Sequence, residues 1–189
     1  MPDTTYGFVV DVDGSVDISN QGIDSIKVKF NVVSEGFFCY VNKLTSLKGS
    51  PCSVGNFYCH SNHLKSLEYA PKHVSKSFVC AMNRLESLKG ALAMVGEDFD
   101  CSNNKLTSLE YCPTSVVGNY DCSSNQLASL EYCPESVGGD FYCSYNPELG
   151  DYQNIKNFTD IKRISDAQRE QKLLNEKIIT RTSSQVYKI

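Results

Sequence analysis

The stretch Phe99–Pro113 reads FDCSNNKLTSLEYCP, and close copies of it recur along most of the chain. A cysteine returns at spacings of 20, 21, 21, 21 and 21 residues, with an aromatic residue two positions before it and an asparagine three positions after it. The cysteines are Cys39, Cys59, Cys80, Cys101, Cys122 and Cys143, the aromatic residues Phe37, Phe57, Phe78, Phe99, Tyr120 and Phe141, and the asparagines Asn42, Asn62, Asn83, Asn104, Asn125 and Asn146. A fixed period of this length predicts a solenoid, in which each repeat buries its apolar face against its neighbours.

The two ends of the array carry weaker copies. Residues 16–26 read VDISNQGIDSI and place Val16 and Ile18 where the aromatic residue and the cysteine stand, while Gln21 replaces the asparagine. The last copy keeps Asn146 but then decays to NPELG. We therefore predict three parts, because terminal repeats are atypical or covered. They are an N-terminal cap over residues 1–15, seven repeats over residues 16–150 with the first one degenerate, and a C-terminal helical cap and tail over residues 151–189.

The repeating unit, F-x-C-x-x-N-x-L-x-S-L-x-x-x-P-x-x-V, resembles the leucine-rich repeat. Its length is similar to that of the short bacterial class, found in the YopM and IpaH effector families, and similar arrays occur in tailed-phage and giant-virus genomes. The resemblance implies a leucine-rich repeat solenoid: a right-handed superhelix with a curved parallel β-sheet on its concave side, extended or 3₁₀ backbone on its convex side and a C-terminal α-helical cap. It also implies protein binding. The ligase activity of the IpaH family is not expected, because no cysteine follows Cys143.

Each recurring residue has a structural role in such a stack. The aromatic residue and the cysteine alternate as in a strand, so both side chains are expected to point inward, where cysteine acts as a small hydrophobe. The asparagine turns the chain out of the sheet, and its amide is expected to bond backbone groups of its own turn and the next, forming a ladder. A repeat of 20–21 residues leaves no room for a full convex helix. Extended backbone is expected there, set by Pro51, Pro71, Pro113 and Pro134.

The composition argues against several classes of function. The nine cysteines form no C-x-x-C pair and indicate free thiols in a reducing cytoplasm, although Cys112 and Cys133 occupy equivalent positions and could approach each other. No signal peptide and no membrane-spanning apolar run occur, and a net charge of -4 without a basic run argues against nucleic-acid binding. No cofactor, metal or catalytic nucleophile is expected, because no serine or cysteine triad surrounds the only histidines, His60, His63 and His73.

The outward positions of the strands form the predicted concave face, which is aromatic in the early repeats and acidic in the later ones. Adjacent strands lie about 4.8 Å apart, so Asp100 and Asp121 should stand side by side, and like charges placed in this way cost stability. A protein partner with a basic surface would recover that energy, with the aromatic side chains as anchors. The predicted partner-binding residues are Phe38, Tyr40, Tyr58, His60, Asp98, Asp100, Asp121, Asp140, Tyr142 and Tyr145.

Other interpretations of the acidic residues stay open. The face could be solvated surface without a role, Asp98, Asn119 and Asp140 form one column that could bind calcium, and two carboxylates could act as a glycosidase pair. An open sheet wraps an ion poorly and a shallow face offers little burial, so we prefer partner binding.

Two further stripes follow from the period. The residues after the ladder asparagines give a basic edge of Lys43, His63, Arg84 and Lys105. The LEYxP segments place Tyr69, Tyr111 and Tyr132 on the descending flank. Each stripe is either repeat-periodic surface or an extension of an interface.

After Gly150 the composition changes to charged, helix-favouring residues. Ser165 with Gln168 resembles a capping box that starts a second helix. Two roles are open for this region: a cap that seals the last repeat, or a helix that binds a partner or dimerises. The first helix has apolar residues at near-helical spacing, Ile155, Phe158, Ile161 and Ile164, and the second has an apolar stripe of Ala167, Leu174 and Ile178 with Leu173 beside it.

These observations predict a non-enzymatic protein-binding module. The resemblance to phage arrays suggests an adaptor or inhibitor that acts on a host protein in the host cytoplasm. The alternative is a structural or adhesive role, as a virion or surface component that recognises a receptor. An enzyme is the least expected class, because neither a nucleophile with a base nor a deep carboxylate pair can be identified.

Overall fold

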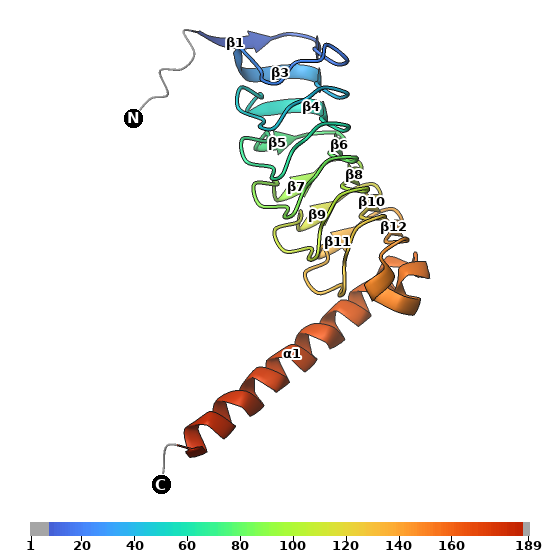
Figure 1. The fold of residues 1–189 in the computed structure, drawn as a ribbon. Helices are drawn as coiled ribbons and strands as arrows, with labels where there is room; N and C mark the ends of the chain where they lie inside the picture. Colours follow the sequence, from blue (N-terminus) through green and yellow to red (C-terminus); the bar gives the residue numbers. More distant parts are fainter. Residues whose placement is uncertain (1–7, 187–189) are drawn as a thin grey trace.

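Two rows of short parallel strands run along the solenoid (Figure 1). The computed structural model describes the backbone of residues 8–186 and the side chains of residues 8–177 and 179. The strands β3 and β4 are long enough to cross both rows, so all strands join in one 12-stranded sheet. The strands are β1 (Val9–Val12), β2 (Val16–Asp17), β3 (Lys29–Phe38), β4 (Ser53–Tyr58), β5 (His73–Val74), β6 (Phe78–Val79), β7 (Met94–Val95), β8 (Phe99–Asp100), β9 (Ser115–Val116), β10 (Tyr120–Asp121), β11 (Ser136–Val137) and β12 (Phe141–Tyr142).

The first row contains the F-x-C segments, in the register that the sequence period predicts. Each aromatic residue lies opposite the aromatic residue of the next turn, from Phe37 opposite Phe57 to Tyr120 opposite Phe141. Val16 in β2 lies opposite Phe37, so the degenerate copy at residues 16–26 belongs to the same row. The chain is therefore a parallel β-solenoid whose turns are about 21 residues long, as the sequence predicts.

The second row contains the P-x-x-V segments and lies on the part of each turn where the sequence predicts extended backbone alone. Val54 pairs with Val74, Val74 with Val95 and Val95 with Val116. Extended backbone that repeats every 21 residues leaves N–H and C=O groups facing the next turn, and pairing satisfies them. The row begins with β1, so residues 9–12 of the predicted N-terminal cap are themselves part of the sheet.

A stack of aromatic rings forms the centre of the core. The rings from Phe37 to Phe141 are fully buried, and neighbouring centroids lie 5.0–5.9 Å apart. Phe30 extends the stack at one end with centroids 5.1 Å from Phe37, and Phe158 extends it at the other with centroids 6.0 Å from Phe141. The row of buried cysteines and the two leucines of each L-x-S-L segment fill the space around the rings.

The predicted asparagine ladder is present. Each of the six amide nitrogens donates to the carbonyl of the cysteine in its own turn at 2.9–3.1 Å. The same nitrogen donates to the equivalent carbonyl of the preceding turn at 2.8–3.2 Å. The amide oxygen accepts a backbone N–H of the preceding turn. For example, Asn104 Oδ1 accepts the N–H of Leu85 at 2.9 Å. One side chain thus satisfies backbone groups of two turns where the chain leaves the sheet.

Each complete turn from β3 onward has two bends with positive φ, and neither is marked by a regular glycine. The residue before the ladder asparagine has φ between 52° and 56° in all six turns, with Met82, Asn103 and Tyr145 among its occupants. The second bend follows the L-x-S-L segment and is occupied by glycine in two turns, at Gly49 and Gly90, and by tyrosine with φ of 68–69° in the others, at Tyr69, Tyr111 and Tyr132. A non-glycine residue in this region costs on the order of 1 kcal/mol, so the surrounding hydrogen bonds must hold these bends in place.

A 3₁₀ segment and one long helix follow the last repeat, η1 (Pro147–Asn154) and α1 (Phe158–Val186). The predicted second helix starting at a Ser165–Gln168 capping box is wrong. Asn157 caps α1, because its Oδ1 accepts the N–H of Thr159 at 2.9 Å, and Ser165 lies buried inside the continuous helix. No helix in the described part of the chain is long and apolar enough to cross a membrane.

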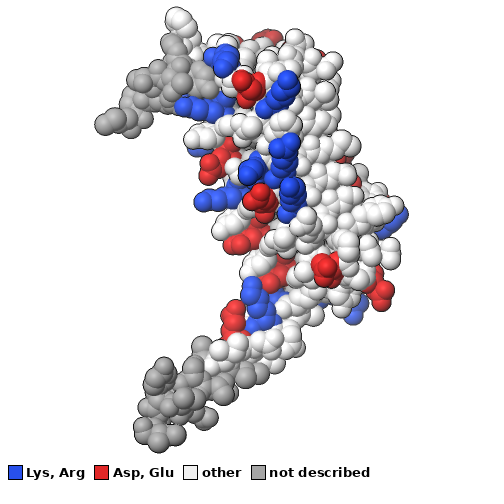
Figure 2. Space-filling model, viewed as in Figure 1, with Lys and Arg blue, Asp and Glu red and all other residues white. Residues whose placement is uncertain are grey.

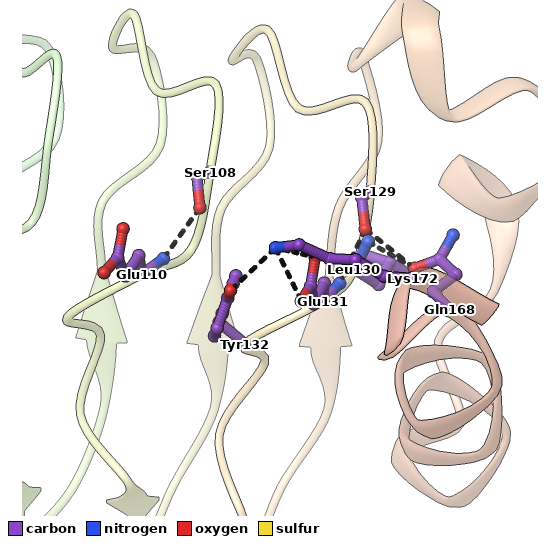
Figure 3. Close-up of polar contacts among 8 residues, drawn as sticks. All are labelled: Ser108, Glu110, Ser129, Leu130, Glu131, Tyr132, Gln168 and Lys172. Atoms are coloured by element: carbon purple, nitrogen blue, oxygen red, sulfur yellow. Dashed lines mark hydrogen bonds and ion pairs between the residues drawn. The ribbon is translucent and has the colours of Figure 1, made fainter. Parts of the chain in front are cut away.

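The helix closes the end of the solenoid with polar contacts as well as with Phe158. In an interior turn, the N–H of Leu67 donates to the carbonyl of Lys89 in the next turn at 3.1 Å. The last complete repeat is followed only by a shortened copy that ends at Gly150, and Gln168 Oε1 accepts the N–H of Leu130 at 2.8 Å and the hydroxyl of Ser129 at 3.0 Å (Figure 3). The C-terminal helix is therefore a cap, as predicted, and Gln168 caps the solenoid rather than its own helix.

Candidate binding surface

The outward side chains of the first strand row form a continuous surface, which we call the strand face. It comprises the residue between the aromatic residue and the cysteine of each turn and the residue directly after the cysteine. Neither set contains lysine or arginine. The first set is Phe38, Tyr58, Val79, Asp100, Asp121 and Tyr142, and the second is Tyr40, His60, Ala81, Ser102, Ser123 and Ser144.

The early half of the strand face is aromatic. The rings of Phe38 and Tyr58 lie side by side with centroids 5.3 Å apart, and Tyr40 stacks on His60 at 4.6 Å with only 9° between the ring planes. Burial lowers the pKa of His60, which Asp100 opposes in part, so the ring is kept neutral near pH 7. These four predicted residues form one half-buried aromatic cluster on neighbouring strands.

The later half places two carboxylates on adjacent strands. Asp100 pairs in register with Asp121, and Asp121 pairs with Tyr142. Each carboxylate accepts the backbone N–H two residues later at 2.8 Å, from Ser102 and from Ser123. Burial is the main cause that raises the pKa of Asp100, and Asp121 adds to it, while the hydrogen bonds from Ser102 oppose it.

Asp98 and Asp140 belong to a different column, which has a structural role that the sequence does not reveal. Side chains in this column accept the N–H at the same position of the next turn: Asp98 Oδ1 from Asn119 at 2.7 Å and Asn119 Oδ1 from Asp140 at 2.8 Å. Asp140, in the last turn, instead accepts the hydroxyl of Tyr142. Asn56 accepts from Ser77 in the same way at 3.2 Å. The one sequence signal is that short oxygen-bearing side chains fill the position before every aromatic residue from the third repeat on: Asn56, Ser77, Asp98, Asn119 and Asp140.

The tyrosines of the last turn lie at the acidic end. Tyr142 donates its hydroxyl to Asp140 Oδ2 at 2.9 Å, which raises the Tyr142 pKa. Lys156, from the segment before α1, lies over the Tyr142 ring with Nζ 5.8 Å from the centroid. Tyr145 occupies the bend after the strand and is 76% exposed. The polar contacts of α1 with the repeats are made on the other flank, to Ser129–Tyr132 and Glu135.

The six cysteines of the repeat column are part of the core rather than of this surface. All nine are free thiols, including Cys112 and Cys133, and the six of the repeat column are buried. Burial raises the pKa of Cys39 to about 12 and that of Cys143 to about 11, and it raises the pKa of Cys101 further above its usual range. Such thiols are poor nucleophiles, because the thiolate is the reactive form.

The strand face holds no cluster typical of a metal site. Across residues 8–186, in so far as their side chains are described, no group of three or more histidine, cysteine, aspartate or glutamate side chains is placed to hold a metal ion. The column of Asp98, Asn119 and Asp140 is occupied by backbone N–H groups, which use one oxygen each of Asp98 and Asn119. The geometry therefore favours recognition by separate side chains along the face over coordination of a single ion.

The basic edge and the tyrosine stripe lie away from the strand face. Figure 2 shows lysine and arginine gathered over the middle of the solenoid, with acidic side chains between them. Lys43, Arg84 and Lys105 are exposed on the basic edge, and an exposed Lys65 lies 4.0 Å from Glu86 on a neighbouring turn. In the tyrosine stripe, Tyr69 and Tyr111 are exposed, whereas Tyr132 lies under Lys172 and Arg169 of α1.

Comparison with protein-family models, with characterised proteins and with solved structures gave no match. The strand face and the repeats that build it are therefore the features from which a function can be inferred.

Proposed function

We propose that this chain is a non-enzymatic protein-binding module of the leucine-rich repeat type, which holds its partner on the strand face. The observation that carries the proposal is the adjacent pair Asp100 and Asp121, continued by the aromatic cluster at Phe38, Tyr40, Tyr58 and His60. The leucine-rich repeat assignment is supported by the strand, the asparagine ladder and the two buried leucines that recur in each turn.

The position of Asp100 is one that the scaffold does not require to be acidic. Phe38, Tyr58 and Val79 occupy the same position in earlier turns with the same strand pairing. Asp100 is partly removed from water and faces a second carboxylate, so its charge costs stability in the free protein. A cationic group of a partner would offset this cost and would also speed encounter.

The positions of the carboxylates and the aromatic cluster indicate which chemical groups a partner would need. One basic side chain, arginine by preference, would contact Asp100 and Asp121 together, because their strands are about 4.8 Å apart. An apolar or aromatic group of the same partner would pack on the cluster around Tyr58 two turns away, about 10 Å along the face. Half-buried aromatic rings beside a charged pair supply the anchors that dominate many protein interfaces.

The form of activity that we propose is an adaptor or inhibitor that acts on a host protein inside a cell. This part rests on the resemblance of the repeat to phage-encoded arrays, and a fold by itself does not name a function. The stability cost at Asp100 supports binding of a protein with a basic surface in any of these roles.

The test is affinity capture from a lysate of the organism of origin, with the bound proteins identified by mass spectrometry. Wild type is compared with Asp100→Lys plus Asp121→Lys, and with the control Glu86→Lys plus Glu110→Lys, which changes the net charge equally on exposed flank residues. If a specific protein is lost with the first variant but not with the control, the result supports binding of that protein at the strand face. Equal recovery with wild type and with both variants, each folded by circular dichroism, contradicts it.

A further inference from the structure

The helix α1 is much longer than the end of the solenoid that it seals. Its first half docks through Ile161, Ser165, Gln168 and Lys172, which are buried or bonded to the last repeat. Figure 1 shows the second half running away from the repeats. Residues 171–177 are all exposed, and two of them are leucines, Leu173 and Leu174. Isolated helical segments of this length are marginal in water, so the projecting half needs tertiary contacts to stay folded.

A second stripe on α1 lies at coiled-coil spacing. Ile164, Ala167, Gln171 and Leu174 follow one another at intervals of three, four and three residues, and the sequence continues the pattern at Ile178, whose side chain lies outside the described part. On a helix of 100° per residue this stripe is about 110° away from the docked side chains. Its part from Ala167 to Leu174 is exposed and faces away from the last repeat, while Ile164 at its start packs partly against the core.

A groove already runs along this stripe. It has a volume of about 500 Å³ and is lined by Asp160, Arg163, Ile164, Ala167, Gln168 and Gln171 of α1 together with Tyr152 of η1. The groove ends where Leu174 begins, so its apolar lining and the exposed leucine form one continuous track along the helix. A second helix lying on the track would cover both.

The charged residues beside the stripe indicate which helix would lie on it. Glu170 and Lys177 both lie next to the stripe at the same heptad position, one heptad apart, and both are exposed. If two copies of α1 pair antiparallel, Glu170 of each copy meets the second copy's Lys177, and the two-fold axis makes this contact twice. The same pairing places Gln171 beside the second copy's Leu174. A parallel pairing would place Glu170 opposite Asn175 and would gain nothing from either charge.

We propose that α1 is a dimerisation element, in which two copies of the chain pair antiparallel through the stripe from Ile164 to Ile178. The stripe covers 15 residues, or about 21 Å of helix. The projecting half of each helix fills the groove beside Tyr152 of the other copy. The dimer carries two strand faces at its two ends and so offers a bivalent surface to a partner.

The first test is sedimentation velocity of the full-length chain over a range of concentrations. The wild type is expected to reach the mass of two chains, and Leu174→Lys to remain at the mass of one. Leu173→Lys is the matched control, because Leu173 is 50% exposed and Leu174 is 52% exposed, but Leu173 lies off the stripe. The control is expected to dimerise like the wild type. A monomeric wild type, or a control that fails while Leu174→Lys dimerises, overturns the proposal.

The second test fixes the direction of pairing. Glu170→Lys brings two lysines together at each contact, and Lys177→Glu brings two glutamates together, so each single variant should raise the dimer Kd by about tenfold or more. The double variant Glu170→Lys/Lys177→Glu restores opposite charges and should return to the wild-type Kd. If neither single variant changes the dimer Kd, the antiparallel arrangement is overturned. Helical content measured on the same samples confirms that every variant is folded.

Discussion

The inner and the outer side of the F-x-C strands behave in opposite ways. On the inner side, the aromatic residue, the cysteine and the ladder asparagine hardly change between turns, and all except the half-buried Asn83 are buried. On the outer side, the residue between them changes from Phe38 to Asp100 while the backbone pairing stays the same. The comparison teaches that the solenoid constrains one side of each strand and leaves the other side free to vary. Four predictions test how far that separation holds.

The largest effect is expected in thiol reactivity. Cys52 is exposed and should react at once with a thiol reagent such as a maleimide. The buried cysteine column should react at least about a thousandfold more slowly in the native protein, because reaction there waits for unfolding. Cys112 is half-buried, and burial raises its pKa to about 12, so it should also react slowly.

Mass spectrometry over time measures this difference, with Cys52→Ser as the control that should lack the fast thiol. Rapid labelling of Cys101 or Cys122 in the folded protein would contradict a sealed interior.

The next effect concerns the asparagine ladder. Asn104→Ala removes the acceptor of the Leu85 N–H and the donor to the carbonyls of Cys80, Cys101 and Ser102. Leaving such buried groups without partners should lower the free energy of unfolding by ~3 kcal/mol, measured by urea denaturation.

The matched control for the ladder variant is Asn103→Ser. Serine already occupies the equivalent bend at Ser61 and Ser124 with φ of 55°, so the change should stay within ~0.5 kcal/mol. Equal destabilisation by both variants would mean that the bend rather than the ladder holds the turn.

A smaller effect is expected at the C-terminal end, where a side chain stands in place of a next complete turn. Gln168→Ala leaves the N–H of Leu130 without its acceptor and should lower the free energy of unfolding by ~1 kcal/mol. The control Gln126→Ala removes an exposed side chain of the last complete repeat and should be close to neutral. If urea denaturation cannot tell the two variants apart, Gln168 is not a cap of the sheet.

The smallest effect, and the only one expected to stabilise, is at the outer position. Asp100→Asn keeps an oxygen that can accept the Ser102 N–H and removes the charge beside Asp121, so it should raise the free energy of unfolding at pH 7 by ~0.5 kcal/mol. The folded protein raises the pKa of Asp100, so its ionisation costs stability above that pKa. The gain should therefore shrink as the pH falls and vanish below the ordinary aspartate pKa of 3.8.

The control for Asp100 is Asp98→Asn, which weakens the charge-assisted hydrogen bond from the Asn119 N–H and should not stabilise. Thermal or urea unfolding at several pH values measures both variants. A destabilising Asp100→Asn at pH 7 would show that the carboxylate serves the scaffold, and it would remove the energetic argument for a basic partner.

Much of the inner side could be predicted from the sequence, because burial forces the same residue types at the same spacing. The period alone gives the parallel register, the inward aromatic and cysteine side chains and the asparagine ladder. The pairing of the P-x-x-V segments could not be predicted, since strands of two residues such as β5 and β7 are too short to show an alternating pattern.

The outer side and the ends were harder to predict for physical reasons. Asp98 and Asp100 are two residues apart and chemically identical. Only the stacking of the turns makes Asp98 the acceptor of an N–H in the next turn, whereas Asp100 accepts the N–H of Ser102 in its own turn and lies beside Asp121. Asn157 and Ser165 both fit a helix cap by residue type, and only the burial of Ser165 against the last repeat decides between them. No glycine marks the positive-φ bends at Met82 and Tyr111, so the residue types there do not predict them.

The asparagine ladder has a consequence for how such a chain can change over evolutionary time. Each rung joins a turn only to the turn before it, and the interior rungs use the same atoms, so a whole 21-residue turn could be duplicated or deleted without leaving any rung incomplete. Where the turn is gained or lost between the aromatic cluster and the carboxylate pair, the two move apart or together by one strand spacing, about 4.8 Å. The distance between two contact points on the strand face can thus change only in whole steps of one turn, while the core remains the same.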